Sequence, residues 1–222
     1  MNLEFRCYLV TSGTDRSTVD TAAQAARAGA GMVQVRAKKT SAAQLLQLTV
    51  AVAEAVAEAN PQTRVVVNDR VDIAMAARQR GAAVHGVHLG QEDLPVTDAR
   101  TLLGGEAIIG LSAGTLEQVR QADQYRKIID YLGVGPFRPT PTKDSGREPL
   151  GLTGYPRIVT ATQLPVIAIG DVTPQDIGEL AGTGIAGVAL VRSIMQAAQP
   201  GRVVHDVLAA WPPERPGSSR QS

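Results

Sequence analysis

The chain has 222 residues, 44% of them hydrophobic and 3% aromatic, with a formal net charge of +1 at pH 7. This composition supports one buried core and a single domain, and the absence of a basic run argues against nucleic acid or an anionic membrane as partner. A lone cysteine, Cys7, rules out a disulfide framework, and no apolar stretch approaches 18 residues or forms a leader, which predicts a cytoplasmic, soluble protein.

Apolar, β-branched runs recur along the chain, and alanine-rich amphipathic segments separate most of them. The runs are Cys7–Thr11, Gly31–Val35, Arg64–Asn68, Gly86–Leu89, Ala107–Leu111, Tyr131–Gly135, Val166–Gly170 and Gly187–Val191. Continuously apolar strands separated by helices are typical of a parallel sheet covered on both faces. The regular repeat without a reversal favours an α/β fold of the (β/α)₈ TIM barrel type over an open sheet. We expect the barrel to span residues 1–211 and the Pro-, Ser- and Gly-rich tail 212–222 to be disordered.

Helix start signals precede several of the amphipathic segments. They are Ser17 or Thr18 before Val19–Ala28, Ser41 before Ala42–Ala59, Thr115, and Pro174 at a first-turn position. Two segments are longer than a plain connection requires. Ala77–His85 is interpreted as a surface extension, and Arg138–Gly154 as an active-site loop that orders on ligand binding.

Basic side chains follow the second predicted strand. Arg36 and Lys38 alternate along an extended segment and therefore point to the same side, with Gln34 beside them. A guanidinium and an ammonium that converge from one strand end can hold a diphosphate. On this motif alone, a solvated strand end is an equally good interpretation.

Carboxylates follow the third and fourth strands. Asp69 comes after Asn68, and Asp93 after Gly86–Leu89. Two carboxylates beside bound phosphates commonly bind Mg²⁺, which completes its coordination with water molecules and substrate oxygens. Alone, Asn68-Asp69 is more typical of a turn, but its convergence with the basic cluster favours a metal site.

Further polar groups follow the later strands. Ser112 ends the fifth strand, where it could donate to a phosphate oxygen or cap a helix. Thr140, Pro141, Thr142 and Lys143 lie in the long loop, and Gly170, Val191 and Arg192 follow the last two strands, where barrels commonly bind a phosphate through backbone N–H groups. His88 is interpreted as a packed strand-end residue.

Five motifs in order resemble those of the thiamine phosphate synthase family and cover the chain up to about residue 195. They are Val33-Gln-Val-Arg-Ala-Lys38, Asn68-Asp-Arg-Val-Asp72, Gly86-Val-His-Leu-Gly-Gln-Glu-Asp93, the segment from Gly133 to Lys143, and Ala168-Ile-Gly170. The resemblance implies a (β/α)₈ barrel that joins 4-amino-5-hydroxymethyl-2-methylpyrimidine diphosphate to a thiazole phosphate, with Mg²⁺, and releases pyrophosphate.

Carried over residue by residue, the resemblance implies that Gln34, Arg36, Lys38, Asn68, Ser112 and Lys143 hold the pyrimidine diphosphate and that Asp69 and Asp93 ligate Mg²⁺. Thr140, Pro141 and Thr142, with Gly170 and the backbone of Val191-Arg192, would meet the thiazole phosphate. Arg36, Lys38, Ser112 and Lys143 would stabilise the leaving charge. The partners are then small-molecule substrates; the sequence does not fix the oligomeric state, and a homodimer is compatible with it.

The chain departs from the family pattern at the last two strands. Asp171 stands where the family usually has a second glycine, and Arg192 where it usually has a serine. We expect these opposite charges on neighbouring strand ends to pair with each other. The rival functions are a thiazole tautomerase of the same superfamily, which would not need Asp69 and Asp93 for a metal, and a non-catalytic phosphate-binding barrel.

Overall fold

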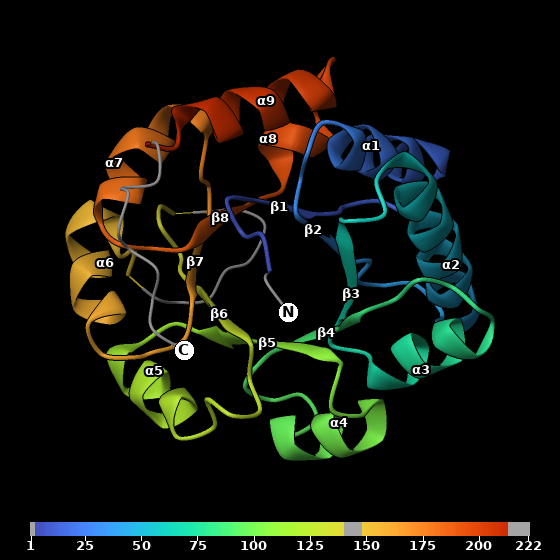
Figure 1. Cartoon of the computed structure of the whole chain (residues 1–222), viewed down its shortest axis with the longest axis horizontal. Helices are drawn as coiled ribbons and strands as arrows, with labels where there is room; N and C mark the ends of the chain where they lie inside the picture. Colours follow the sequence, from blue (N-terminus) through green and yellow to red (C-terminus); the bar gives the residue numbers. More distant parts are fainter. Residues whose placement is uncertain (1–2, 140–147, 213–222) are drawn as a thin grey trace.

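The computed structural model describes residues 3–139 and 148–212, which form a closed parallel barrel with helices outside it (Figure 1). Each strand pairs with the next along the chain, and β8 closes on β1. The strands are β1 Cys7–Val10, β2 Met32–Val35, β3 Arg64–Asn68, β4 Gly86–Leu89, β5 Ile108–Ala113, β6 Tyr131–Val134, β7 Val166–Ile169 and β8 Gly187–Leu190. The predicted (β/α)₈ barrel is therefore confirmed, with every predicted strand present.

Helices surround the barrel in the same order. They are α1 Arg16–Arg27, α2 Ala42–Ala59, α3 Val71–Gln79, α4 Val96–Leu103, α5 Leu116–Asp123, α6 Gly151–Val159, α7 Ile177–Gly182, α8 Arg192–Met195 and α9 Pro200–Ala210, with a 3₁₀ turn η1 Pro174–Asp176 before α7. The predicted start signals at Ser41, Thr115 and Pro174 are confirmed. The boundary of a single domain at residue 211 stays a prediction, and the predicted disordered tail lies outside the described residues from 213 onward.

Two local expectations are wrong. α1 begins at Arg16 because the Asp15 carboxylate, rather than Ser17 or Thr18, accepts the Thr18 backbone N–H. Ala77–His85 is not a surface extension: α3 runs on to Gln79, Ala77 is buried, and the Arg78 guanidinium donates to the carbonyls of Val84 and His85. The segment looks long in the sequence because its first residues belong to α3, and the rest is a connection to β4 that the Arg78 hydrogen bonds hold in place.

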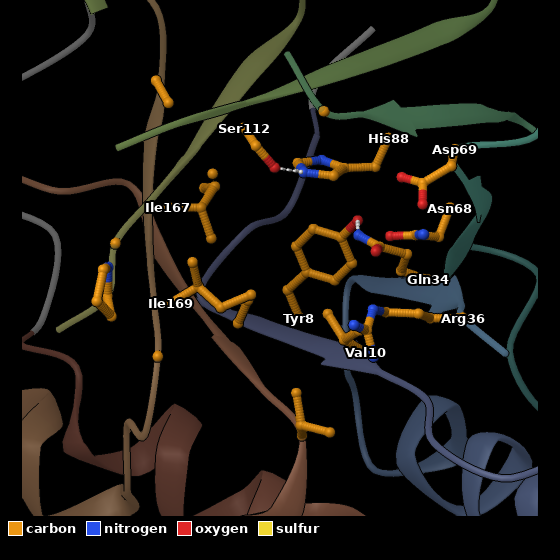
Figure 2. A pocket seen from close by; sticks show the side chains of 18 of the residues that line it. Tyr8, Val10, Gln34, Arg36, Asn68, Asp69, His88, Ser112, Ile167 and Ile169 are labelled. Carbon is orange, nitrogen blue, oxygen red and sulfur yellow. Dashed lines mark hydrogen bonds between the residues drawn. The ribbon is translucent and has the colours of Figure 1, made fainter. Parts of the chain in front are cut away.

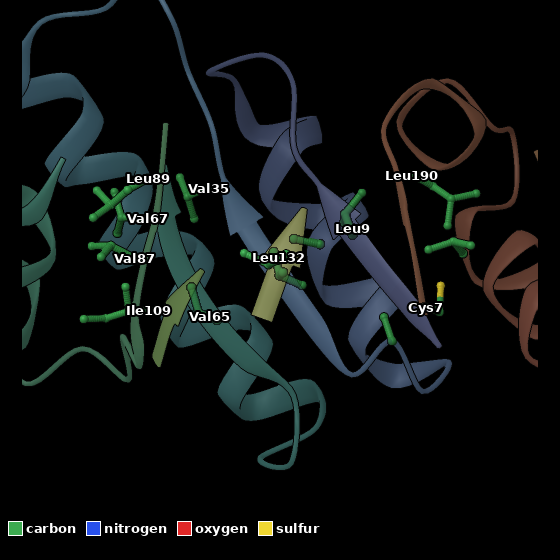
Figure 3. Close-up of a cluster of buried hydrophobic side chains, with 14 of the residues drawn as sticks. Cys7, Leu9, Val35, Val65, Val67, Val87, Leu89, Ile109, Leu132 and Leu190 are labelled. Atoms are coloured by element: carbon green, nitrogen blue, oxygen red, sulfur yellow. The ribbon is translucent and has the colours of Figure 1, made fainter. Parts of the chain in front are cut away.

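Two apolar cores follow from the two faces of each strand. The outward residues pack against the helices, and Figure 3 shows part of this layer around Cys7, Leu9, Val35, Val65 and Leu132. Burial raises the pKa of the Cys7 thiol to about 12, so this side chain behaves as a small hydrophobe, as predicted.

The inward residues form a smaller cluster inside the barrel. It contains Tyr8, Val10, Met32, Val66, Ile108, Tyr131, Ile167 and Ala189, with Phe5 beneath them. Toward the carboxyl ends of β2–β5 the inward positions change to Gln34, Asn68, His88 and Ser112. Because side chains alternate along a strand, the sequence therefore places polar groups at one mouth of an otherwise apolar barrel.

Among the described residues, α2 is the one helix long and apolar enough to cross a membrane by length and composition alone. Its apolar face, with Leu45, Leu48, Val52 and Val56, is buried in the outer core layer. In this structure the helix is part of the barrel wall.

Candidate active site

A cavity of about 460 Å³ opens at the carboxyl ends of the strands. It is lined by most of the site residues expected from the sequence, namely Gln34, Arg36, Lys38, Asn68, Asp69, Asp93, Ser112, Gly170, Val191 and Arg192. Thr140, Pro141, Thr142 and Lys143 lie outside the described residues. The strand-end clusters, although up to 158 positions apart in the chain, are thus brought to one place.

The cavity has a polar and an apolar side (Figure 2). Gln34, Arg36, Asn68 and Asp69 gather on one side of the view, from β2, β3 and the segments that follow them, and Ile167 and Ile169 of β7 lie opposite. Binding sites for small molecules commonly combine an apolar wall with a few polar groups that fix orientation.

The two carboxylates expected to hold a metal meet at the polar side. Burial raises the pKa of Asp69, and a hydrogen bond and the negative charge of Asp93 raise it further; Lys38 and the Asn68 side chain oppose this effect. The Lys38 Nζ lies 4.0 Å from Asp69 Oδ2. Asp93 Oδ2 accepts the Gly90 backbone N–H at 2.5 Å, which fixes the turn after β4. The adjacent carboxylates repel each other when both are ionised, so a cation bound between them would be stabilised.

A divalent cation fits this pair. Among the described residues, no group of three or more His, Cys, Asp and Glu side chains could hold a metal. Mg²⁺ needs no such group, because it usually takes one or two carboxylates together with waters and substrate phosphate oxygens. Asp69 and Asp93 would hold it, and the donor set suits Mg²⁺ better than a metal that requires nitrogen or sulfur ligands.

The basic strand end after β2 is partly withdrawn from water. The Arg36 backbone N–H donates to Thr11 Oγ1 at 3.0 Å, which ties the end of β2 to β1. Burial lowers the pKa of the Arg36 guanidinium and the nearby Asp69 charge raises it, but an arginine remains charged at neutral pH. Partial desolvation strengthens the attraction of this cation for an anionic ligand.

The expected pair of opposite charges on the last two strand ends is confirmed. The Arg192 guanidinium donates to the Asp171 carboxylate, which bridges the ends of β7 and β8. A second pair lies behind it: Arg138 donates to both carboxylate oxygens of Asp176 and to the Asp171 carbonyl. Burial raises the pKa of Asp176, but the hydrogen bonds from Arg138 and Thr173 outweigh it and leave that pKa lowered.

Gly170 lies at the same strand end, with a φ of 106°. A Cβ at this position would lie 2.7 Å from Pro136 Cα and 2.9 Å from the Phe137 backbone N, so only glycine fits here. The close approach leaves backbone groups at the cavity wall, where barrels commonly bind a phosphate.

Several residues that line the cavity are absent from the sequence prediction. They include Tyr8, Tyr131 and Ser193. His88, interpreted as a packed residue, is indeed buried but also lines the cavity and contacts Tyr131 and Ser112. The signal that could have found the tyrosines is strand alternation: Tyr8 shares an inward parity with Val10, at the mouth of β1.

The described geometry can be compared with known proteins. The family model for thiamine monophosphate synthase matches residues 7–194. The thiamine-phosphate synthase of Corynebacterium jeikeium is 56% identical over 210 residues, covering 95% of this chain and 96% of that protein. The corresponding protein of Corynebacterium efficiens is 55% identical over 198 residues, covering 89% and 90%. The solved structure of thiamine phosphate pyrophosphorylase from Pyrococcus furiosus has a TM-score of 0.79 at 28% identity, covering 94% and 96%.

Proposed function

The chain belongs to the thiamine monophosphate synthase family and is a transferase, and from this premise we propose its substrates and mechanism. It joins 4-amino-5-hydroxymethyl-2-methylpyrimidine diphosphate to 4-methyl-5-(2-phosphooxyethyl)thiazole and produces thiamine phosphate and pyrophosphate; with the carboxylated form of the thiazole it would also release carbon dioxide. The observation that carries the proposal is the meeting of Arg36, Lys38, Asp69 and Asp93 in a cavity where Ile167 and Ile169 lie opposite Arg36 and Asp69.

With the uncarboxylated thiazole, the reaction replaces one bond by another without a net change in protons. The bond between the pyrimidine methylene carbon and the diphosphate oxygen breaks, and its electron pair leaves with pyrophosphate. The lone pair of the thiazole nitrogen then forms the new carbon–nitrogen bond. The electron-rich aminopyrimidine can carry the intermediate positive charge, so no protein nucleophile is required.

The chain's own residues would stabilise the charge that develops on the leaving group. Arg36 and Lys38 supply positive charge from the end of β2, and Ser112 and Asn68 supply hydrogen-bonding groups. The resemblance assigns the same role to Lys143, which lies outside the described residues. Asp69 and Asp93 would hold Mg²⁺, which would neutralise diphosphate charge when bound. Because these groups are already oriented, little reorganisation is needed as the bond breaks.

The apolar side of the cavity has a different role. Ile167 and Ile169 offer a surface against which the flat heterocyclic rings can pack. The same side chains would keep water away from the methylene cation, which water would otherwise capture to give the alcohol. The thiazole phosphate would bind near Gly170, Val191 and Arg192, on the opposite side from the diphosphate.

The test is to incubate the purified protein with both substrates and Mg²⁺ and to measure thiamine phosphate by its conversion to fluorescent thiochrome. We expect product only when both substrates are present, and loss of product when EDTA removes the divalent metal. Binding of the phosphorylated ligands without turnover would identify a non-catalytic barrel. Isomerisation of a thiazole phosphate without condensation would identify a tautomerase.

A further inference from the structure

A continuous row of hydrogen bonds crosses the barrel interior along the lining of the cavity. Gln34 Nε2 donates to Tyr8 Oη at 2.8 Å, and Tyr8 Oη lies 2.7 Å from Tyr131 Oη. Tyr131 Oη lies 3.0 Å from His88 Nδ1, and His88 Nε2 lies 2.9 Å from Ser112 Oγ. Figure 2 shows the two ends, Gln34 with Tyr8 and His88 with Ser112. We call these five residues, from β2, β1, β6, β4 and β5, the polar row.

Most of the polar row is cut off from water. Tyr131 is fully buried, Tyr8 is 1% exposed and Gln34 is 4% exposed. Burial raises the pKa of both tyrosine hydroxyls, so each keeps its proton across the neutral range. Each hydroxyl carries one proton, and in this row each has one neighbour to accept from and one to donate to.

The chemistry of the first member sets the direction of all the others. An amide N–H₂ can only donate, so Tyr8 must accept from Gln34 and pass its own proton toward Tyr131. Tyr131 then donates to His88 Nδ1, which leaves the imidazole neutral with its proton on Nε2. His88 Nε2 therefore donates to Ser112 Oγ.

We propose that Gln34 is a positioning residue that fixes the direction of the polar row, so that Ser112 turns its hydroxyl proton toward an anionic oxygen of the bound ligand. Ser112 lines the cavity, and in the direction inferred for the row its oxygen accepts from His88, so its proton is available to the cavity. In the reverse direction, Ser112 would donate to His88 and present only lone pairs to the ligand.

The proposal deepens the proposed function and rests on it for the identity of the ligand. A donor that is aimed before the bond breaks stabilises a leaving diphosphate without reorganisation. A neutral donor also has an advantage over a further cation, because it does not repel the positive charge that forms on the pyrimidine methylene carbon.

Two glycines make room for the central contact of the row. A Cβ at Gly110 would lie 2.2 Å from Tyr131 Cζ and 2.6 Å from His88 Nδ1, and one at Gly133 would lie 3.0 Å from His88 Cε1. Both glycines occupy inward positions on β5 and β6; a side chain at Gly110 would collide with both rings, and one at Gly133 would press on the His88 ring. The absence of side chains at Gly110 and Gly133 therefore leaves the space in which Tyr131 and His88 meet.

The direction can be read directly from the ring nitrogens of His88 by ¹⁵N NMR of the free, full-length protein, which has three histidines to assign. We expect the proton on Nε2. The Gln34→Glu variant, at a pH where ¹³C shifts show that the new carboxylate is ionised, can only accept at this position, so the row should reverse and the proton should move to Nδ1. A proton on Nδ1 in the natural protein, or no move in the ionised variant, overturns the proposal.

A binding experiment tests whether the row acts through Ser112. Tyr131→Phe interrupts the row without adding charge, and the probe is inorganic pyrophosphate with Mg²⁺, measured by calorimetry. We expect Ser112→Ala and Tyr131→Phe each to weaken binding by about 5-fold, the value of one hydrogen bond, and the double variant to weaken it no further. Additive losses would show that the row does not act through Ser112 and would overturn the proposal.

Tyr155→Phe is the matched control. Tyr155 is also fully buried, but its hydroxyl donates to the Val134 carbonyl in the outer core layer at 2.9 Å, away from the cavity. We expect pyrophosphate binding to be unchanged in this variant. Because the NMR measurement needs no substrate, a proton on Nε2 in a protein that makes no thiamine phosphate would refute the proposed function and leave the direction of the row standing.

Discussion

The two sides of the barrel mouth balance their charges in different ways. After β2–β4, the Asp69 and Asp93 carboxylates contact each other, with Arg36 and Lys38 beside them. After β7 and β8, Asp171 pairs with Arg192, and Asp176 behind it pairs with Arg138. On the first side two carboxylates and two cations are present, but the carboxylates contact each other and the one ion pair is the long Lys38–Asp69 contact of 4.0 Å, so a metal between the carboxylates and an anion beside the cations would both be stabilised. The second is balanced within the protein, which leaves a phosphate there to be bound chiefly by backbone N–H groups. Variants on the first side should therefore affect turnover most.

The largest expected effect is at the metal carboxylates. Asp69→Ala or Asp93→Ala should lower kcat by at least about 10²-fold and weaken the dependence on Mg²⁺, because each removes a charge that would anchor the metal to the diphosphate. Glu54→Ala, at an exposed carboxylate of α2, is the control. Near-normal turnover with an unchanged Mg²⁺ response in both site variants would contradict the metal assignment.

Lys143 is the next test, since the resemblance assigns it to the diphosphate together with Arg36 and Lys38, although it lies outside the described residues. Lys143→Ala should lower kcat on the order of 10²-fold, by analogy with the removal of one oriented donor to a transition state. Steady-state kinetics with each substrate varied in turn would measure this. A rise in KM at constant kcat would instead indicate uniform binding of the ground state and the transition state.

A smaller effect is expected on the β7–β8 side. Arg192→Ser should weaken binding of the thiazole phosphate by about 10-fold, because it leaves the Asp171 charge uncompensated beside an anion. Asp171→Gly combined with Arg192→Ser should restore the affinity, measured by calorimetry. A double variant that binds no better than Arg192→Ser would show that the pair does not set the affinity of this side.

The smallest effect is on stability without metal. The pKa of Asp69 is raised in the folded chain, so its contribution to stability is fully present below the pKa of the unfolded chain and is lost as the pH rises through the folded value. In EDTA, Asp69→Asn should therefore raise Tm at pH 7 by about 1–2 °C, a modest value because the carboxylate is partly exposed. The difference should be much smaller near pH 3, where the carboxyl group is largely protonated in both the folded and the unfolded chain. An equal gain at both pH values would show that the charge is not its cause.

Much of the fold and part of the site could be predicted because each depends on short-range patterns. Apolar runs with helix signals between them suffice for a barrel, and the polar groups after Gln34 and Asn68 stand where a barrel gathers its site. The pairing of Asp171 with Arg192 could be predicted because both residues depart from the pattern of the family, carry opposite charges and follow neighbouring strands. Each inference needed only the order of the strands.

What could not be predicted depends on which residues meet across the closed barrel. Tyr8 and Tyr131 lie 123 positions apart on strands that are not neighbours, and each reads in sequence as part of an apolar run. Their contact exists because the inward faces of β1 and β6 oppose each other and because Gly110 leaves space for the Tyr131 ring. Similarly, the start of α1 was misplaced because Asp15, Ser17 and Thr18 are all acceptable caps and tertiary packing selects among them.

Asp69 and Asp171 share a backbone property whose effect reaches beyond the site. Their φ angles are 63° and 58°, in the left-handed region that costs a residue with a side chain about 1–2 kcal/mol. Glycine would relieve this strain at either position, and asparagine would lessen it. A library of variants selected for thermal stability alone should therefore replace these aspartates and lose one carboxylate from each side of the mouth. At both positions, selection for a durable protein and selection for the reaction act in opposite directions.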